Sequence, residues 1–309
     1  MIRSFAPEDG EAVAALLDED VVPHAHTGAG IRHRLASQPA RAHARAWVAI
    51  VDEQVAGWSE AGLEWATSAD DVAGLWIFVA PAQRRGGLGG ELYDAARAHL
   101  EDVGARSLEA WSSDEEGARF LVARGFRPVR TQRVLQLDLD TANVAGLAAL
   151  GVAKEAEGFS VAPLAAVAYR AKELHALDAA ATADVPATYA EDDFRYEDWL
   201  ADTLEHPQLS LEGSAVVLAG EELVAYALLH VEPRSRAAAN EMTGTRADLR
   251  RRGLARLAKL AAIAWAREQG FATIRTSCDG ENAPMLRLNE SLGYRPVAVE
   301  TEYLLEDLR

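Results

Sequence analysis

The sequence contains a single cysteine, Cys278, in a chain of 309 residues. One cysteine cannot form a disulfide within the chain, and it cannot supply the thiolate cluster that holds zinc or an iron–sulfur centre. A free cysteine usually behaves as a small buried apolar residue, and we expect this of Cys278. The early histidines do not stand at metal-ligand spacing with acidic residues. No metal site is therefore predicted, and surface positions are expected for His24, His26, His33 and His43.

Positive charge is also scarce. The chain has 31 Lys and Arg against 48 Asp and Glu, which gives a formal net charge of -17. Such a protein repels nucleic acids and anionic lipids unless a local basic site binds them. No apolar run approaches the ~18 residues of a membrane span, and Glu8 and Asp9 stand where a signal peptide would be apolar. We therefore expect a cytoplasmic protein with no nucleic-acid or membrane partner.

The sequence does contain ample material for a core. Hydrophobic residues make up 49% and charged residues 26%, a balance typical of globular proteins, and the length suits two domains. Two loops rich in Arg and Gly stand out, at 84–89 and 250–255, and both have the pattern Arg-x-x-Gly-Leu-Gly/Ala. Their central glycines, Gly87 and Gly253, are 166 positions apart (253 − 87 = 166).

Two further landmarks repeat at nearly the same offset. The pattern Gly-aromatic-Arg-Pro occurs at 125–128 and at 293–296 (293 − 125 = 168). Before each loop, two short strand-like runs flank a polar turn, at 47–58 and 215–226, which indicates a hairpin. Three landmarks in the same order predict two homologous domains. We place these domains at 1–140 and 159–309, joined by an Ala- and Gly-rich linker at 141–158.

Each copy has the order strand, one or two helices, hairpin, strand, Gly loop, helix, strand, helix, strand. A Gly-rich turn that opens a helix offers free N–H groups and the positive end of the helix dipole to phosphate oxygens. The arginines of both loops add charge-assisted hydrogen bonds. Neither loop completes the Gly-x-Gly-x-x-Gly dinucleotide motif or the Gly-Lys-Ser/Thr nucleotide motif. Another pyrophosphate ligand is therefore expected.

At these residues the chain resembles, twice, the GNAT superfamily of acyl-CoA-dependent N-acyltransferases, whose signature is Gln/Arg-x-x-Gly-x-Gly/Ala between the fourth strand and the third helix. The resemblance implies an α/β (α+β) fold of two tandem GNAT domains, each a mixed, mostly antiparallel sheet flanked by helices, an architecture similar to mycothiol synthase. It also implies acetyl-CoA as the co-substrate. The residues that it assigns to coenzyme A lie on the fourth strands, in both loops and after the fifth strand: Val79, Thr243, Thr245, Arg84, Arg85, Gly86, Gly87, Leu88, Gly89, Arg250, Arg251, Arg252, Gly253, Leu254, Ala255 and Asn282.

The same resemblance directs attention to the second half for catalysis. GNAT enzymes often use a fourth-strand glutamate as general base, and Glu241 is a candidate where the first copy has Leu75. A solvated Glu241 facing away from the cleft is the alternative. The usual tyrosine acid would stand seven residues after Asn282, where this chain has Asn289. The thiolate would then leave unaided or through water.

The expected function is transfer of an acetyl group from acetyl-CoA to a primary amine of a small molecule, by direct attack in a ternary complex. The alternative is a non-catalytic acyl-CoA-binding or regulatory protein with degenerate GNAT halves, and a third possibility is another phosphorylated ligand. The acidic, aromatic stretch 191–199 could attract a cationic amine or could be a solvated helix start. A monomer and a homodimer are both compatible with the sequence.

Overall fold

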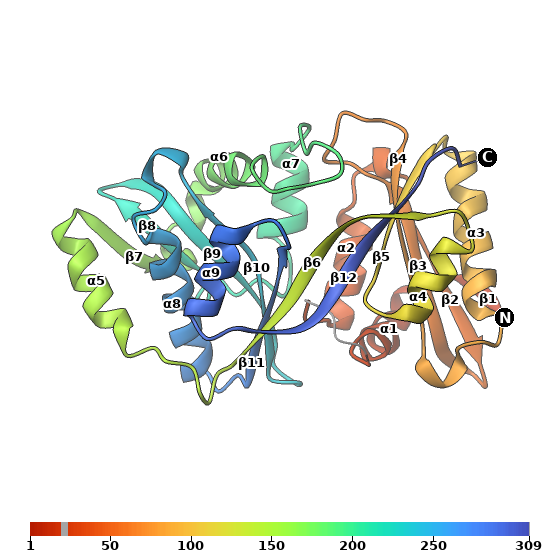
Figure 1. The fold of residues 1–309 in the computed structure, drawn as a ribbon, viewed down its shortest axis with the longest axis horizontal. Helices are drawn as coiled ribbons and strands as arrows, with labels where there is room; N and C mark the ends of the chain where they lie inside the picture. The colour runs from red at the N-terminus through yellow and green to blue at the C-terminus, as the bar shows by residue number, and fades with distance from the viewer. Residues whose placement is uncertain (20–23, 309) are drawn as a thin grey trace.

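The computed structural model describes residues 1–19 and 24–308. Its first half follows the predicted order of elements (Figure 1). The strands and helices of this half are β1 (Ile2–Ser4), α1 (Gly10–Leu17), α2 (Gly28–Ser37), β2 (Arg45–Val51), β3 (Gln54–Leu63), β4 (Val72–Val79), α3 (Leu88–Asp102), β5 (Ser107–Ser112), α4 (Glu115–Val122) and β6 (Arg127–Asp138).

The second half repeats this order after an extra helix, α5 (Gly146–Ala156), which lies in the predicted linker. Its elements are β7 (Phe159–Pro163), α6 (Ala171–Thr182), α7 (Tyr196–Trp199), β8 (Ala215–Ala219), β9 (Glu222–Glu232), β10 (Ala237–Thr245), α8 (Leu254–Glu268), β11 (Thr273–Asp279), α9 (Ala283–Ser291) and β12 (Arg295–Leu305). Short 3-10 turns precede α3 and α8 at Pro81–Gln83 and Ala247–Leu249. The domain limits proposed from the sequence stay a prediction.

Both predicted hairpins are present, and both are closed by residues in the left-handed region. Asp52 and Glu53 (φ 50° and 64°) turn the chain between β2 and β3, and Gly220 (φ 61°) does so between β8 and β9. Each hairpin also has one register irregularity, after Ala49 and after Val217. These two positions are 168 residues apart, so the repeat extends to the detail of strand pairing.

The strands form one continuous sheet in the order β1-β2-β3-β4-β5-β12-β6-β11-β10-β9-β8-β7. The pairs β4–β5 and β10–β11 are parallel and the other pairs are antiparallel. The tandem α+β prediction is therefore confirmed, with the two sheets joined edge to edge. Helices cover both ends, and β6 and β12 cross side by side between them (Figure 1).

The last strand of each half crosses into the other half. Strand β6 pairs with β11, and β12 pairs with β5. The side chains follow the pairing, because Leu135 and Leu137 of β6 pack in a core with Ile263 of α8, whereas Tyr303 of β12 packs with Leu100 of α3. Each half thus needs a strand of the other to complete its core. Both termini consequently lie at the first half (Figure 1).

None of the helices in the described part of the chain combines the length and the apolar character that a bilayer crossing requires. Cys278, on β11, is buried as expected, and burial raises the pKa of its thiol to about 11. No group of three or more His, Cys, Asp or Glu among residues 1–19 and 24–308 is placed to hold a metal ion.

Candidate functional site

The two Gly- and Arg-rich loops have the same backbone conformation. Arg85 and Gly87 lie in the left-handed region (φ 67° and 94°), and so do Arg251 and Gly253 (φ 62° and 79°). Glycine suits such a position because it has no Cβ to clash with the backbone. In each loop the first arginine also holds the preceding strand. Its Nε donates to a strand-end carbonyl, from Arg84 to Val79 at 3.0 Å and from Arg250 to Thr245 at 3.2 Å.

Each loop opens a 15-residue helix, α3 or α8, at a glycine N-cap that has no side-chain cap. The first N–H groups of such a helix lack intrahelical acceptors and carry the positive end of the helix dipole. Each loop therefore has the N–H groups that the predicted anion site requires, and anion binding itself stays a prediction. The loop arginines also contact carboxylates: Arg84 with Asp114, Arg85 with Glu116, Arg250 with Asp184 and Arg252 with Glu157.

Beside the second loop lies a cavity of about 820 Å³ between β10 and β11. These parallel strands pair only from Ala237 to Ala239, and they then separate. The cavity brings together most of the coenzyme residues predicted in this half, namely Thr243, Thr245, Arg250, Arg251, Gly253, Leu254, Ala255 and Asn282, together with Glu241. Arg252 does not line it, because its guanidinium pairs with Glu157 and lies 4.7 Å from the ring of Phe159.

Strand β10 is irregular where it borders this cavity. Its pairing with β9 shifts register between Asn240 and Thr243. The Asn240 amide donates to the carbonyls of Leu228 (2.8 Å) and Met242 (3.3 Å), so its side chain holds both strands at the bulge. Strand β4 pairs with β3 in continuous register from Gly57 to Leu63. The bulge is therefore a feature of the second half, and a bulge re-aims the side chains of its strand.

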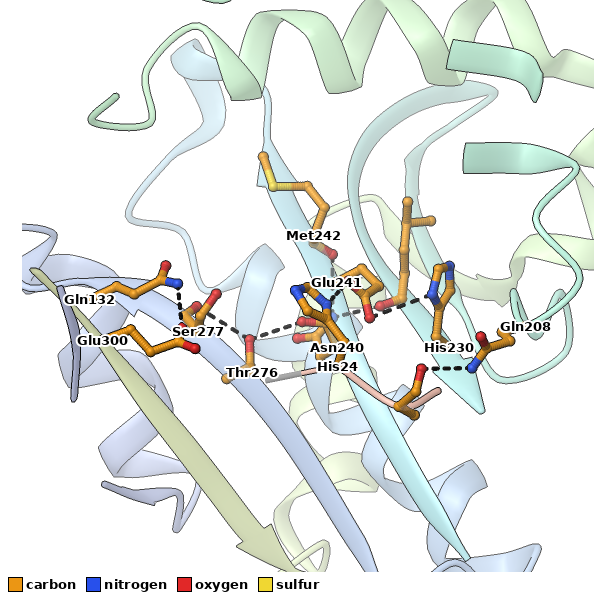
Figure 2. Close-up of polar contacts among 12 residues, drawn as sticks. His24, Gln132, Gln208, His230, Asn240, Glu241, Met242, Thr276, Ser277 and Glu300 are labelled. Carbon is orange, nitrogen blue, oxygen red and sulfur yellow. Dashed lines mark hydrogen bonds and ion pairs between the residues drawn. The ribbon is translucent and has the colours of Figure 1, made fainter. Parts of the chain in front are cut away.

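Glu241 lies at this bulge and contacts a residue of the first half (Figure 2). One of its carboxylate oxygens is 2.9 Å from His24 Nδ1, and the other is 3.5 Å from His230 Nδ1 on β9. Burial alone would raise the pKa of Glu241, but the neighbouring His24 and His230 outweigh it and lower this pKa to about 2. The side chain of His24 is 44% exposed, so the loss of hydration opposes its charge only in part, and the Glu241 carboxylate raises its pKa. The two side chains form a hydrogen-bonded pair between the halves.

Other histidines gather next to this pair. The rings of His206 and His230 stack with centroids 4.3 Å apart, and His33 meets His206 edge-on at 5.2 Å. Burial lowers the pKa of both His206, to about 3, and His230. The expectation of surface positions is correct for His24 and His43, but His33 and His26 are half-buried. His26 and His33 lie where the two halves meet. The sequence of one half alone does not predict which of its residues the other half covers.

The remaining candidates of the second half occupy the start and the interior of α9. Asn282 is the N-cap of α9, and its Oδ1 accepts from the Met285 N–H at 3.2 Å. Its counterpart Asp114 caps α4 in the same way. Asn289 is fully buried, and among the described residues neither its amide nitrogen nor its amide oxygen has a partner. An asparagine amide cannot act as a proton donor in acid catalysis, so Asn289 does not replace the tyrosine acid that usually stands at this position.

The first loop borders a second cavity, of about 580 Å³, that includes Val79, Arg84, Arg85, Gly87 and Gly89. Gly86 and Leu88 are not part of its wall. Trp58, Trp76, Trp111 and His24 also line it, and His24 contacts Glu241. Gln132, whose amide donates to Glu300 at 2.7 Å, lines both cavities. Figure 2 shows Gln132 and Glu300 beside Ser277, so the cavities meet at the join between the halves.

The acidic stretch 191–199 is mostly engaged in contacts with the first half. Asp192 accepts from Ser68 (2.7 Å to its N–H), Asp198 pairs with Arg41, and Phe194 stacks on Trp65. Trp199 is buried and donates to Asp178. Of this stretch only Glu191 lines the cavity of the second half. Neither sequence interpretation describes it fully, because its main partners are residues of the other half.

Comparisons with known proteins agree with this geometry. The model of the Acetyltransferase (GNAT) family matches residues 11–126 and again 173–294. A GCN5-related N-acetyltransferase from Sphaerobacter thermophilus has a similar structure over 100% of this chain and 96% of its own, with 17% identity and a TM-score of 0.68. A tandem GNAT protein from the clavulanic acid biosynthesis pathway covers 99% of this chain and 98% of its own, with 19% identity and a TM-score of 0.73. No curated protein matches the chain significantly in sequence.

Proposed function

Because the chain belongs to the GNAT acetyltransferase family, we propose that its second half transfers an acetyl group from acetyl-CoA to the primary amine of a small molecule. One observation carries this proposal above the others. The anion-binding loop, the gap between β10 and β11 and Glu241 all line one cavity, and Glu241 contacts His24, which lines the adjoining cavity. Phosphate binding, thioester placement and proton removal thus have adjoining sites.

The proposed binding mode follows from the shape of the cavity. The pyrophosphate of coenzyme A lies on the N-terminus of α8, where Arg251 has no carboxylate partner among the described residues. The pantetheine arm runs along β10 in the gap that β11 leaves. The acetyl group then reaches the bulge at Asn240, next to Glu241. The described residues contain no nucleophile–base arrangement that a covalent acyl-enzyme would require there, since Cys278 has a raised pKa.

Proton removal is assigned to His24, with Glu241 as its partner. A carboxylate with a pKa of about 2 is a weak base for an ammonium group, whereas an imidazole beside a carboxylate is a stronger one. His24 Nδ1 is held by Glu241, so Nε2 is the nitrogen that takes the proton. Glu241 fixes the tautomer of His24 and stabilises the imidazolium that forms. The aspartate of a Ser-His-Asp triad has the same role toward its histidine. The amine attacks the thioester carbonyl directly, and the C–S bond breaks.

The first half is proposed to be non-catalytic. It has Leu75 where the second half has Glu241, and its β4 pairs in continuous register where β10 has a bulge. Asp114 replaces Asn282, which places a carboxylate close to the first loop, where it pairs with Arg84. The first half contributes His24 and the cavity wall beyond it.

A non-catalytic acyl-CoA-binding protein is the second candidate, and the asparagine at position 289 favours it. The test that separates the two is continuous detection of released thiol, with acetyl-CoA and a panel of primary amines of different size and charge. We expect release that depends on one class of amine and stops at stoichiometric acetylation of that amine, with the N-acetyl product identified by mass spectrometry. Release at the rate of hydrolysis with every amine would favour the binding protein.

A further inference from the structure

Direct transfer leaves coenzyme A as a thiolate, and the described cavity contains one side chain suited to protonate it. Its arginines cannot give up a proton at ordinary pH. Glu241 is ionised, and Asp279 is ion-paired with Arg130. Cys278 and the aliphatic side chains offer no acid of suitable strength. Asp184 is paired with Arg250, and Glu191, whose pKa burial raises, lies in the segment before α7. The amine of Lys259 also lines the cavity, and it reaches Asn240 at the bulge. We propose that Lys259 is the general acid that protonates the departing thiolate, an inference that rests on the proposed acetyl transfer.

The position of Lys259 places its amine inside the wall of the cavity. It lies six residues after Gly253 on α8, roughly 9 Å further along the helix at 1.5 Å per residue. Only 2% of the residue is exposed, and Nζ donates to Asn240 Oδ1 at the bulge. Thr243 Oγ1 donates to the same oxygen at 3.1 Å, and the Tyr294 ring centre is 5.1 Å from Nζ. Lys259 thus reaches from the pyrophosphate helix to the bulge where the thioester is proposed to lie.

The surroundings of Lys259 suit a group that donates and regains a proton near neutrality. Burial lowers the pKa of its ammonium to about 7, and the Cys278 thiol on β11 opposes this slightly. The facing titratable groups are Cys278 and Tyr294, and burial raises the pKa of both. No carboxylate pairs with Lys259 anywhere in residues 1–19 and 24–308. The first copy has Tyr93 at the corresponding position, so the amine belongs to the second half alone.

The step balances in atoms and charge. The amine attacks in its neutral form: its nitrogen bonds to the carbonyl carbon, becomes positively charged and gives one proton to His24. When the tetrahedral intermediate collapses, the C–S electron pair passes to sulfur, which takes a proton from Lys259 Nζ. The products are the N-acetyl amide and the coenzyme A thiol. His24 releases its proton to water, and the neutral Lys259 regains one from water.

The test titrates the thiol of bound coenzyme A by the ultraviolet absorbance of the thiolate. An ammonium within contact distance lowers the pKa of a neighbouring thiol by roughly 1 to 3. We expect that Lys259→Met and Lys259→Gln raise the pKa of the bound thiol by this amount and reduce kcat by roughly 100-fold, the lower end of general acid catalysis. Lys172→Met, outside both cavities, is the matched control and should change neither.

A comparison in the unaltered protein covers the case in which these variants do not fold. Affinity for coenzyme A should rise with pH up to about pH 7, where Lys259 of the free protein loses its proton, whereas affinity for desulfo-coenzyme A, which has no thiol, should not. Coenzyme A that binds with the same pH dependence as the desulfo analogue would overturn the role of Lys259 and leave the acetyl transfer standing. If neither ligand binds folded protein, both proposals are wrong.

Discussion

Replacing Arg130 with methionine is expected to lower the free energy of unfolding by about 3 to 5 kcal/mol, because the change leaves two buried carboxylates without their cation. Arg130, on β6, contacts Glu302 on β12 and Asp279 on β11. The distance from Arg130 Nη1 to Asp279 Oδ2 is 3.1 Å. The side chains of Glu302 and Asp279 are 0% and 5% exposed. Arg130 also donates to the Pro186 carbonyl at 2.5 Å. The strands that exchange between the halves therefore meet at this one guanidinium.

Urea denaturation of Arg130→Met against the unaltered protein measures this loss. Arg97→Met is the matched control, because Arg97 pairs with Glu101 at 2.7 Å on the exposed face of α3. An exposed pair at this helical spacing contributes about 0.3 to 0.5 kcal/mol. If both variants lose the same small amount, Arg130 does not bind the exchanged strands together. We also expect a lower apparent cooperativity in Arg130→Met, since β6 and β12 complete each other's cores.

Replacing Glu241 with glutamine is expected to reduce kcat/KM by roughly 100- to 1000-fold, within the range of general base catalysis. The substitution keeps the shape of the side chain but removes the charge that raises the pKa of His24. The acidic limb of the pH–rate profile should therefore move to lower pH, since His24 loses its proton more easily without the carboxylate. The comparison of kcat/KM against pH in both proteins measures the shift.

His24→Asn tests the same pair from the other side. Its loss should match that of Glu241→Gln, and the double variant should lose little more, because residues that act as a unit are not additive. Glu53→Gln, in the exposed turn between β2 and β3, is the control and should be unaffected. An unchanged pH profile in Glu241→Gln would exclude the pair from proton transfer. Additive losses would mean that the two residues act separately.

The sequence predicts the features of this protein that depend on local spacing. The offset of 166 to 168 residues locates both loops, both hairpins and the helices that follow, because each pattern is complete within a short segment. The loops carry the same left-handed residues at Arg85 and Arg251 for the same reason. Sequence spacing therefore suffices for the tandem fold and for the position of the two loops.

The sequence does not predict which half receives each final strand. An alternating strand after α4 pairs equally well with β5 or with β11, and only the packing of both halves decides between them. The hydrogen-bonded pair of His24 and Glu241 joins residues 217 positions apart, one in each half. The position of the Lys259 amine could not be predicted from the sequence for a different reason. At its place in an apolar helix face, a lysine usually extends its amine to solvent, and only the Asn240 side chain shows where this one ends.

Isothermal titration with acetyl-CoA tests the central claim most directly, with the unaltered protein, Arg251→Glu and Arg85→Glu in parallel. We predict one equivalent bound by the unaltered protein. Arg251→Glu should weaken binding by roughly 10- to 100-fold, the contribution of a charge-assisted hydrogen bond, and Arg85→Glu should not. Equal weakening by both variants, or loss with Arg85→Glu alone, would contradict the assignment of the coenzyme to the second half. No binding by folded protein free of copurified coenzyme A would overturn the proposed function itself.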